Sequence, residues 1–186
     1  MAVIVSIESE PMSGKALLCN ILCKKGNFRC GNEDIGETLG KNLISDFSSW
    51  VFEYCLSKIL SVTPVDANRV VYTNLYAKHT LVKSLHLMKV INDNQFELLS
   101  QCCDLCLGHL QPTLVLYGSS DIQNPDTRCN SKTEFFLKKI TGMRRVYRNF
   151  FAGCNVKVIR INSEYPYSDG VIMDRIANTI ETSLQG

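Results

Sequence analysis

The sequence predicts an α/β fold of three layers, in which a mainly parallel sheet of five strands is covered by helices on both faces. Two observations lead to this prediction. Five short apolar runs alternate with longer segments of helical periodicity, and parallel strands need crossovers long enough to hold a helix. No internal repeat, low-complexity stretch or linker divides the 186 residues. We therefore expect one domain over residues 1–186, which at this length buries roughly 70% of its unfolded surface.

The first strand and the first helix enclose a candidate phosphate-binding loop. The apolar run at residues 2–7 leads through a short loop to Gly14 and Lys15, and a helical run begins at Ala16. In such a loop, backbone N–H groups and the positive end of the helix hold a phosphate, and the lysine reaches its outer oxygens. The full pattern is G-x-x-x-x-G-K-[ST]; here Ser9 replaces the first glycine and Ala16 replaces the hydroxyl residue. On the residues alone, an ordinary strand, loop and helix with a surface lysine is an equal alternative.

The second strand is predicted at residues 28–30, after a helix stop at Gly26. Glu33 and Asp34 follow this strand closely. They stand where the ligands of open α/β sheets bind, beyond the carboxyl ends of the strands. The alternative is a solvated loop, with Asp34 capping the next helix.

The remaining elements follow from periodicity and from stop signals at proline, glycine and asparagine. We expect one long helix after the third strand, a polar surface loop after the fourth, and an interruption or bend near Gly142 in the helix that follows that loop. The predicted helices span residues 35–44, 46–60, 75–90, 92–107, 132–152 and 168–184, and the later strands span residues 68–73, 111–117 and 156–161.

The cysteines favour reduced thiols in the core of an intracellular protein. Their number, nine, is odd, and most lie inside apolar helical runs, which does not suit a disulfide framework. Cys102, Cys106 and His109 fall at helical spacings. They are interpreted as a cysteine-lined core face, with a metal site as the alternative, because no second ligand cluster accompanies them.

The net charge of the chain does not indicate a particular class of binding partner. The formal net charge is +2 and there is no long basic block, so we expect no nucleic-acid partner. Arg144, Arg145 and Arg148 form either an anion site or a solvated basic face. His79 and His86 are interpreted as solvated or capped side chains. The apolar run near the N-terminus is too short for a signal peptide or a membrane span, so we expect no membrane partner and a cytoplasmic protein.

With these elements in place, the chain resembles the deoxyribonucleoside kinase and thymidylate kinase family, including the small kinases carried by large DNA viruses. The resemblance covers nearly the whole length and rests mainly on element order. Residues 7–9 (Ile-Glu-Ser) and 14–16 (Gly-Lys-Ala) match the family's Ile-Glu-Gly-x-x-x-x-Gly-Lys-Ser apart from the two departures above. It implies a P-loop nucleoside triphosphate hydrolase-like fold, ATP and Mg²⁺ as cofactors, and a homodimer. It further implies a deoxynucleoside or its monophosphate as substrate, thymidine or thymidylate first, and host cytoplasm or a virion if the chain is viral.

The resemblance also implies roles for individual residues. Glu33, eighteen residues after Lys15, stands where the family has its base for the 5′-hydroxyl. Arg128 lies in the expected lid, at about residues 119–131, and would close over the phosphates together with Lys15. The residues implied at the phosphates of ATP are Ser13, Gly14, Lys15 and Ala16, and those implied at the substrate are Phe52, Glu53 and Tyr72.

Several departures from the family pattern weaken the case for catalysis. The third strand ends in Tyr72-Thr73-Asn74, where the family has Glu-Arg-Ser or Asp-Arg-Tyr. With Ala16 also in place of a hydroxyl, no residue is predicted as a metal ligand. Glu10 adds a carboxylate to the loop, and losing one electrostatic contact of this kind costs roughly 10²- to 10³-fold in rate. Two hypotheses follow: a working ATP-dependent kinase, or a catalytically degenerate homologue with a binding, regulatory or structural role.

Overall fold

The computed structural model describes residues 2–11, 15–32, 47–119, 131–162, 174 and 178–183, and residues 178–183 are helical. In chain order the elements are β1 (Val3–Glu8), α1 (Lys15–Lys25), β2 (Arg29–Cys30), α2 (Phe47–Leu60), β3 (Arg69–Thr73), η2 (Lys78–Val82), α3 (Lys83–Leu87), α4 (Asp93–Leu107), β4 (Leu114–Ser119), α5 (Ser131–Ala152) and β5 (Lys157–Asn162). The predicted helix at 35–44, the pair Glu33 and Asp34, and nearly all of the expected lid lie outside the described residues.

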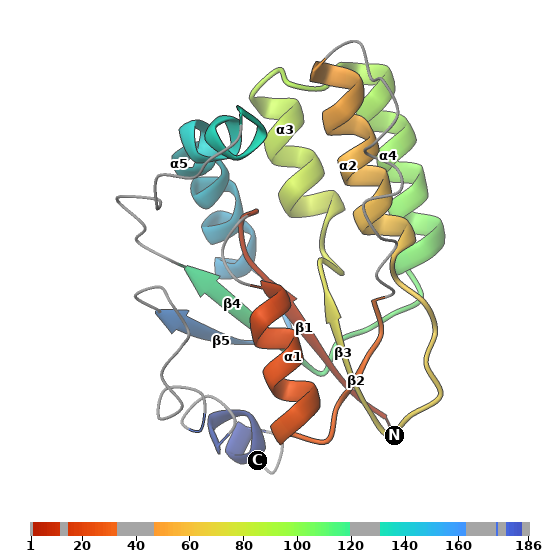
Figure 1. Ribbon diagram of the computed structural model, residues 1–186, viewed down its shortest axis with the longest axis vertical. Helices are drawn as coiled ribbons and strands as arrows, with labels where there is room; N and C mark the ends of the chain where they lie inside the picture. Colours follow the sequence, from red (N-terminus) through yellow and green to blue (C-terminus); the bar gives the residue numbers. More distant parts are fainter. Residues whose placement is uncertain are drawn as a thin grey trace.

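The five strands form one sheet in the order β2-β3-β1-β4-β5, and every pair in it is parallel. Strand β1 lies at the centre and pairs with β3 on one side and with β4 on the other (Figure 1). The predicted α/β class, with a five-stranded parallel sheet flanked by helices, is confirmed.

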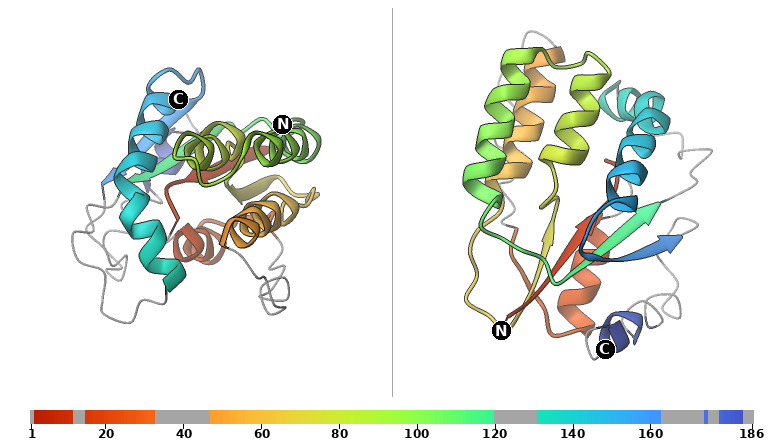
Figure 2. Two further views of the ribbon diagram at one scale, coloured as in Figure 1. Left: turned by 90° about the horizontal axis from the view of Figure 1, so that it is seen from above. Right: turned by 180° about the vertical axis from the view of Figure 1, so that it is seen from behind.

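Alternation along β1 sends its side chains to opposite faces of the sheet. Val5 and Ile7 pack with Leu18 and Leu22 of α1 in one hydrophobic cluster. On the other face, a larger cluster joins β3 and β4 to the helices from α2 to α5. Helices α2, α3 and α4 stand side by side beyond the carboxyl ends of β1 and β3, as two opposite views show (Figures 1 and 2). A ligand at this edge of the sheet therefore meets helices on several sides.

The long helix expected at residues 75–90 begins with a turn of π-helix. The N–H of Val82 donates to the carbonyl of Ala77, five residues back, at 2.9 Å. The hydroxyls of Thr80 and Ser84 each donate to the carbonyl four residues earlier, at 2.8 and 2.6 Å. The carbonyl of Tyr76 also accepts the N–H of Thr80 at 3.1 Å, and hydroxyls that bond to a helix in this way often bend it.

Two other expectations need correction. Helix α5 continues through Gly142, so the expected interruption is wrong, while a bend at this position stays a prediction. A Cβ at Gly142 would lie 3.2 Å from the sulfur of Met88, so this glycine allows α5 to approach the end of α3. Strand β4 begins at Leu114 and runs through Gly118 to Ser119, later than expected, since Pro112 has no N–H to offer a ladder.

No helix within the described ranges is long and apolar enough to cross a membrane. The eight cysteines in these ranges are free. Cys103 of α4 is buried, while Cys102 and Cys106 are half-buried against the larger cluster. Among these same residues, no three His, Cys, Asp or Glu side chains are arranged to hold a metal ion, and the core interpretation of the α4 cysteines agrees with this packing.

Replacing Gly31 with alanine should destabilise the edge of the sheet. An added Cβ would lie 2.0 Å from a ring carbon of Tyr72, so ring or backbone must shift at a cost of about 1 to 3 kcal/mol. In thermal unfolding, the melting temperature should fall by roughly 2 to 4 °C for each kcal/mol. The matched control is Gly153→Ala, whose added Cβ would lie 3.9 Å from its nearest neighbour. Equal melting temperatures for the two variants would contradict this packing.

Candidate functional site

The central strand brings the candidate site to the carboxyl edge of the sheet. After β1 the chain goes to β2 and β3 on one side, and only later to β4 and β5 on the other. In open α/β sheets, ligands bind in the crevice where the strand order changes direction in this way. Lys15 is the first residue of α1, and α1 begins beyond the carboxyl end of β1 (Figure 1).

The lysine is held by the loop that precedes it. Its amine donates to the carbonyl of Ser9 and, at 3.1 Å, to the carbonyl of Glu10. Ala16, the next residue, is exposed and offers no side-chain oxygen, while Ser13 and Gly14 lie outside the described residues. The ammonium group and the free N–H groups of an 11-residue helix together favour an anion here.

A buried carboxylate, Glu8, lies beneath the loop. Its side chain is 0% exposed, and its Oε1 accepts from the hydroxyl of Ser6 at 2.6 Å and from the N–H of Tyr76 at 3.1 Å. Its Oε2 receives no hydrogen bond from the described residues. Burial is the main cause that raises the pKa of Glu8 to about 7, against the opposing attraction of Lys15.

Burial acts on Lys15 in the opposite direction. It lowers the pKa of the lysine to about 8, although Glu8 and Glu10 both favour the charged amine. The pKa values of Glu8 and Lys15, about 7 and about 8, therefore both lie near neutral pH. Such perturbed pairs are concentrated at functional sites.

A second carboxylate, Glu10, is also 0% exposed and points away from the loop surface. The hydroxyl of Tyr117 donates to its Oε1 at 3.4 Å, and Nε of Arg144 lies 3.8 Å from the same oxygen. Burial raises the pKa of Glu10, and Arg144 opposes the rise. Arg144 was expected in an anion site or on a solvated face. Instead it connects α5 to the loop after β1, and Glu10 is turned inward rather than toward the phosphate position.

An aromatic cluster extends this site between α2 and α5. Tyr147 of α5 is fully buried, and its pKa is raised by burial and by the nearby Glu8. Farther out, the ring of Phe136 lies 5.2 Å from Tyr54 and 5.8 Å from Trp50, between centroids. Sequence reasoning did not identify this cluster, although aromatic residues at positions 47, 50 and 54 of one helix face were a visible signal.

The residues predicted to contact substrate lie in different settings. Phe52 packs against the larger core cluster, and Glu53, its neighbour in α2, is half-buried. Tyr72 is 2% exposed, and its hydroxyl donates to the carbonyl of Thr63 at 3.2 Å, so its polar atom supports the edge of the sheet near β2. Glu33 and Arg128 lie outside the described residues.

The end of β3 is closed by amide groups. Oδ1 of Asn32 accepts from the N–H of Thr73 at 2.6 Å, and its Nδ2 donates to the hydroxyl of Ser61 at 3.2 Å. Asn74, with a φ of 63°, donates its N–H to the carbonyl of Ile7 at 3.2 Å. With no oxygen from Ala16 and none of the family's acidic residues here, the described residues do not fit a Mg²⁺ site.

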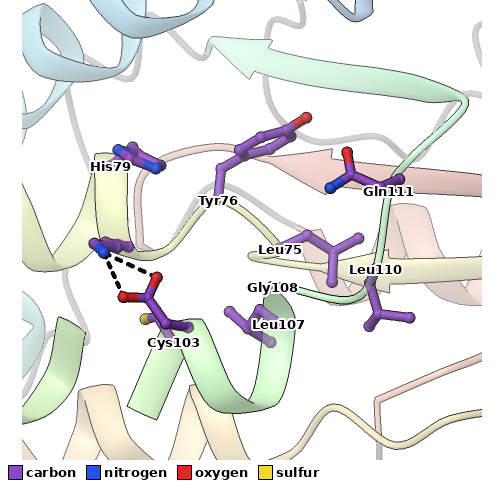
Figure 3. Close-up of a pocket in the computed structure, with 10 residues that line it drawn as sticks. Leu75, Tyr76, His79, Cys103, Leu107, Gly108, Leu110 and Gln111 are labelled. Carbon is purple, nitrogen blue, oxygen red and sulfur yellow. Dashed lines mark hydrogen bonds and ion pairs between the residues drawn. The ribbon is translucent and has the colours of Figure 1, made fainter. Parts of the chain in front are cut away.

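A cavity of about 150 Å³ opens beside this region (Figure 3). Tyr76 and His79 lie on one side of it and Cys103 and Leu107 of α4 on the other, and Lys78 pairs with Asp104 at 2.6 Å. Ligand pockets for molecules of nucleoside size have about 300 to 1,000 Å³. The cavity is therefore too small to be the nucleotide site.

Comparison with known proteins identifies the fold. No family model and no curated protein sequence matches the chain. Among solved structures, deoxyadenosine kinase from M. mycoides with bound dCTP has a TM-score of 0.64 and 13% identity, over 97% of this chain and 100% of that chain. The same kinase with bound dATP has a TM-score of 0.62 and 13% identity, over 96% of this chain and 100% of that chain. The five-stranded parallel architecture of this chain is thus the fold of these two solved structures.

Replacing Glu8 with glutamine should remove a pH dependence of stability. Below about pH 4.5 the carboxyl is protonated in both the folded and the unfolded chain, so its ionisation does not lower the free energy of unfolding. Between pH 4.5 and about 7 the unfolded chain ionises first, so the stability of the native protein falls as pH rises and stays lower above pH 7. Glutamine keeps the acceptor for Ser6 and Tyr76 but does not ionise.

Urea unfolding at pH 5 and at pH 8 measures this effect. The difference in free energy of unfolding between Glu8→Gln and the native protein should shift in favour of the variant by up to about 3 kcal/mol from pH 5 to pH 8. Glu97→Gln, an exposed position on α4, is the control and should follow the native profile. If Glu8→Gln followed it too, the raised pKa of Glu8 would be refuted.

Proposed function

We propose that this chain is a nucleotide-kinase-like protein. It binds the phosphates of ATP at the N-terminus of α1 and transfers the terminal phosphoryl group to a deoxynucleoside or its monophosphate, with thymidine and thymidylate as the first acceptors to test. The observation that supports this most is the place of Lys15, at the first turn of α1 and beside the central strand of the sheet. A phosphate there meets an ammonium group and helix N–H groups together.

The fold supports the proposal from a second side. Two solved structures that match nearly the full length of this chain are of a deoxyadenosine kinase, with bound dCTP and with bound dATP. In this chain, the aromatic rings between α2 and α5 continue from the buried carboxylates outward. A nucleotide with its phosphates at Lys15 would find flat apolar surfaces for its base in that direction.

The proposed roles follow the resemblance residue by residue. Lys15 leaves the carbonyls of Ser9 and Glu10 to contact phosphate oxygens, in a loop formed with Ser13, Gly14 and Ala16. Glu33 accepts the proton of the acceptor hydroxyl. The oxygen of that hydroxyl attacks the γ-phosphorus, and the bond between the γ-phosphorus and the oxygen of ADP breaks. Arg128 closes over the transferred group. The residues proposed to contact the substrate are Phe52, Glu53 and Tyr72. No step is assigned to Mg²⁺, because the described residues do not fit it.

A second candidate is a degenerate homologue that keeps binding without turnover, in a regulatory or structural role, in host cytoplasm or in a virion. Two features favour it. Ala16 places a methyl group where the family ligates Mg²⁺, and Asn32, rather than a charged pair, closes the end of β3. Phosphoryl transfer depends on positive charge around the transferred group, so binding at Lys15 would outlast catalysis.

Substitution of Lys15 decides between these functions. Purified protein is incubated with labelled ATP, Mg²⁺ and each deoxynucleoside or monophosphate, alongside Lys15→Ala, Glu33→Gln and the control Lys24→Ala, an exposed lysine of the same helix. A kinase should lose at least about 10²-fold in kcat/KM in the first two variants and nothing in the control.

A thermal-shift measurement with ATP tests nucleotide binding when no turnover is found. A ligand at 100 times its Kd stabilises the protein by about 2.7 kcal/mol, and Lys15→Ala should abolish this rise in both candidate functions. A rise without turnover would support the degenerate homologue. Neither turnover nor a rise in the native protein would reject nucleotide binding altogether.

We also propose a homodimer that forms through α4. Leu98 and Leu105 lie seven residues apart, on the same face of this helix, and are 53% and 80% exposed. Leu105→Glu should place a charge in the interface and shift the sedimentation of the protein from dimer to monomer. Leu87→Glu, an exposed leucine on α3, is the control and should leave the dimer intact. A native protein that sediments as a monomer at high concentration would rule out this dimer.

A further inference from the structure

Three cysteines gather where α1 crosses the edge of the sheet, apart from the proposed nucleotide site. Cys19 and Cys23 lie one helical turn apart on α1, and Cys30 is the last residue of β2. The sulfur atoms of Cys19 and Cys30 are 3.3 Å apart. This separation is already within reach of bond formation, since a disulfide needs about 2.0 Å and a Cβ–Cβ distance that neighbouring side chains adopt by small rotations.

The two sulfurs differ in access. Cys30 is exposed, while Cys19 is 4% exposed and packs in the cluster that joins α1 to β1 and β3. Burial, followed by hydrogen bonding to Cys30, raises the pKa of Cys19, and burial also raises the pKa of Cys23. A small oxidant in solution therefore reaches Cys30 first, and Cys19 reacts only with the sulfur that is already beside it.

We propose that Cys19 and Cys30 form an oxidisable dithiol that closes to a disulfide between α1 and β2 when it meets a low-molecular-weight disulfide such as oxidised glutathione.

The chemistry proceeds in two exchanges. The Cys30 thiolate attacks one sulfur of oxidised glutathione, that S–S bond breaks, and one glutathione leaves as a thiolate that takes up a proton. Cys19 then loses its proton and attacks the sulfur of Cys30, the mixed disulfide breaks, and the second glutathione leaves. Two protein thiols are oxidised and one glutathione disulfide is reduced to two glutathione molecules, so atoms and electrons balance.

The position of this bond gives it a structural consequence. Cys19 lies one helical turn beyond Lys15, and Cys30 precedes Asn32, which holds the end of β3 through Thr73. Closure ties the helix that carries Lys15 to the strand that leads to residue 33. Its effect on nucleotide binding rests on the proposed function, but bond formation does not, and the two are measured separately.

Peptide mapping of the full-length chain tests the proposal. Trypsin cleaves after lysine and arginine, so Cys30 falls in the peptide 30–41, while Cys19 shares the peptide 16–24 with Cys23. The variant Cys23→Ser leaves Cys19 as the single thiol of that peptide. After oxidation by glutathione disulfide, alkylation of the remaining thiols and digestion without reductant, we expect a linked pair of these peptides that is lighter than their sum by two hydrogen atoms.

Four controls make the result decisive. Cys30→Ser should abolish the linked pair, whereas Cys106→Ser, a half-buried cysteine on α4, should retain it. The same oxidation in denaturing urea should reduce the yield several-fold, because the folded chain is what holds the two sulfurs together. Dithiothreitol should restore both thiols in the folded protein.

The opposing results are equally definite. A peptide 30–41 that keeps glutathione or an alkyl group while 16–24 stays alkylated would overturn the proposal, as would a native protein in which fragmentation locates the bond at Cys23. Nucleotide-induced thermal shifts of the oxidised and reduced forms are then compared. Equal shifts, or none, would bear on the proposed function and would leave the mapped disulfide standing.

Discussion

Burial of two carboxylates at the end of β1 is the constraint around which the neighbouring structure is arranged. A buried carboxylate costs several kcal/mol unless donors or positive charges face it. Glu8 receives a hydroxyl from its own strand and an N–H from the residue that opens the turn after β3. Glu10 receives Tyr117 from β4 and the charge of Arg144 from α5. Elements far apart in the chain therefore converge on one short segment because its charges need partners.

This arrangement determines which groups Lys15 contacts when no ligand is bound. The lysine donates to carbonyls of its own loop, and a buried carboxylate lies close enough to influence its proton affinity. An incoming phosphate would compete with these internal partners. It would also bring negative charge near Glu8, which favours the protonated form of that carboxyl. Anion binding and proton uptake are coupled at such a site.

The edge of the sheet at β2 is held by a glycine and by amide groups rather than by charged groups. Strand β2 has only two residues, too few to hold position by ladder hydrogen bonds alone. The ring of Tyr72 occupies the space that a side chain at Gly31 would need, and Asn32 bonds to Ser61, the residue after α2, and to Thr73 of β3. Cys30 adds a sulfur contact to α1. The edge strand is thus attached by contacts with β3, with α1 and with the residue after α2, and its proposed disulfide would strengthen an existing contact.

Local patterns in the sequence determined most of the helices and strands. Apolar runs predicted the five strands, helical periodicity predicted the helices between them, and Lys15 was correctly expected at the start of α1, because these features depend on residues within a few positions of one another. Tertiary structure alone decided the strand order, the inward turn of Glu10, its pairing with Arg144 and the approach of Cys19 to Cys30. Glu10 and Arg144 are far apart in sequence, and no local periodicity encodes which distant charge a buried carboxylate will meet.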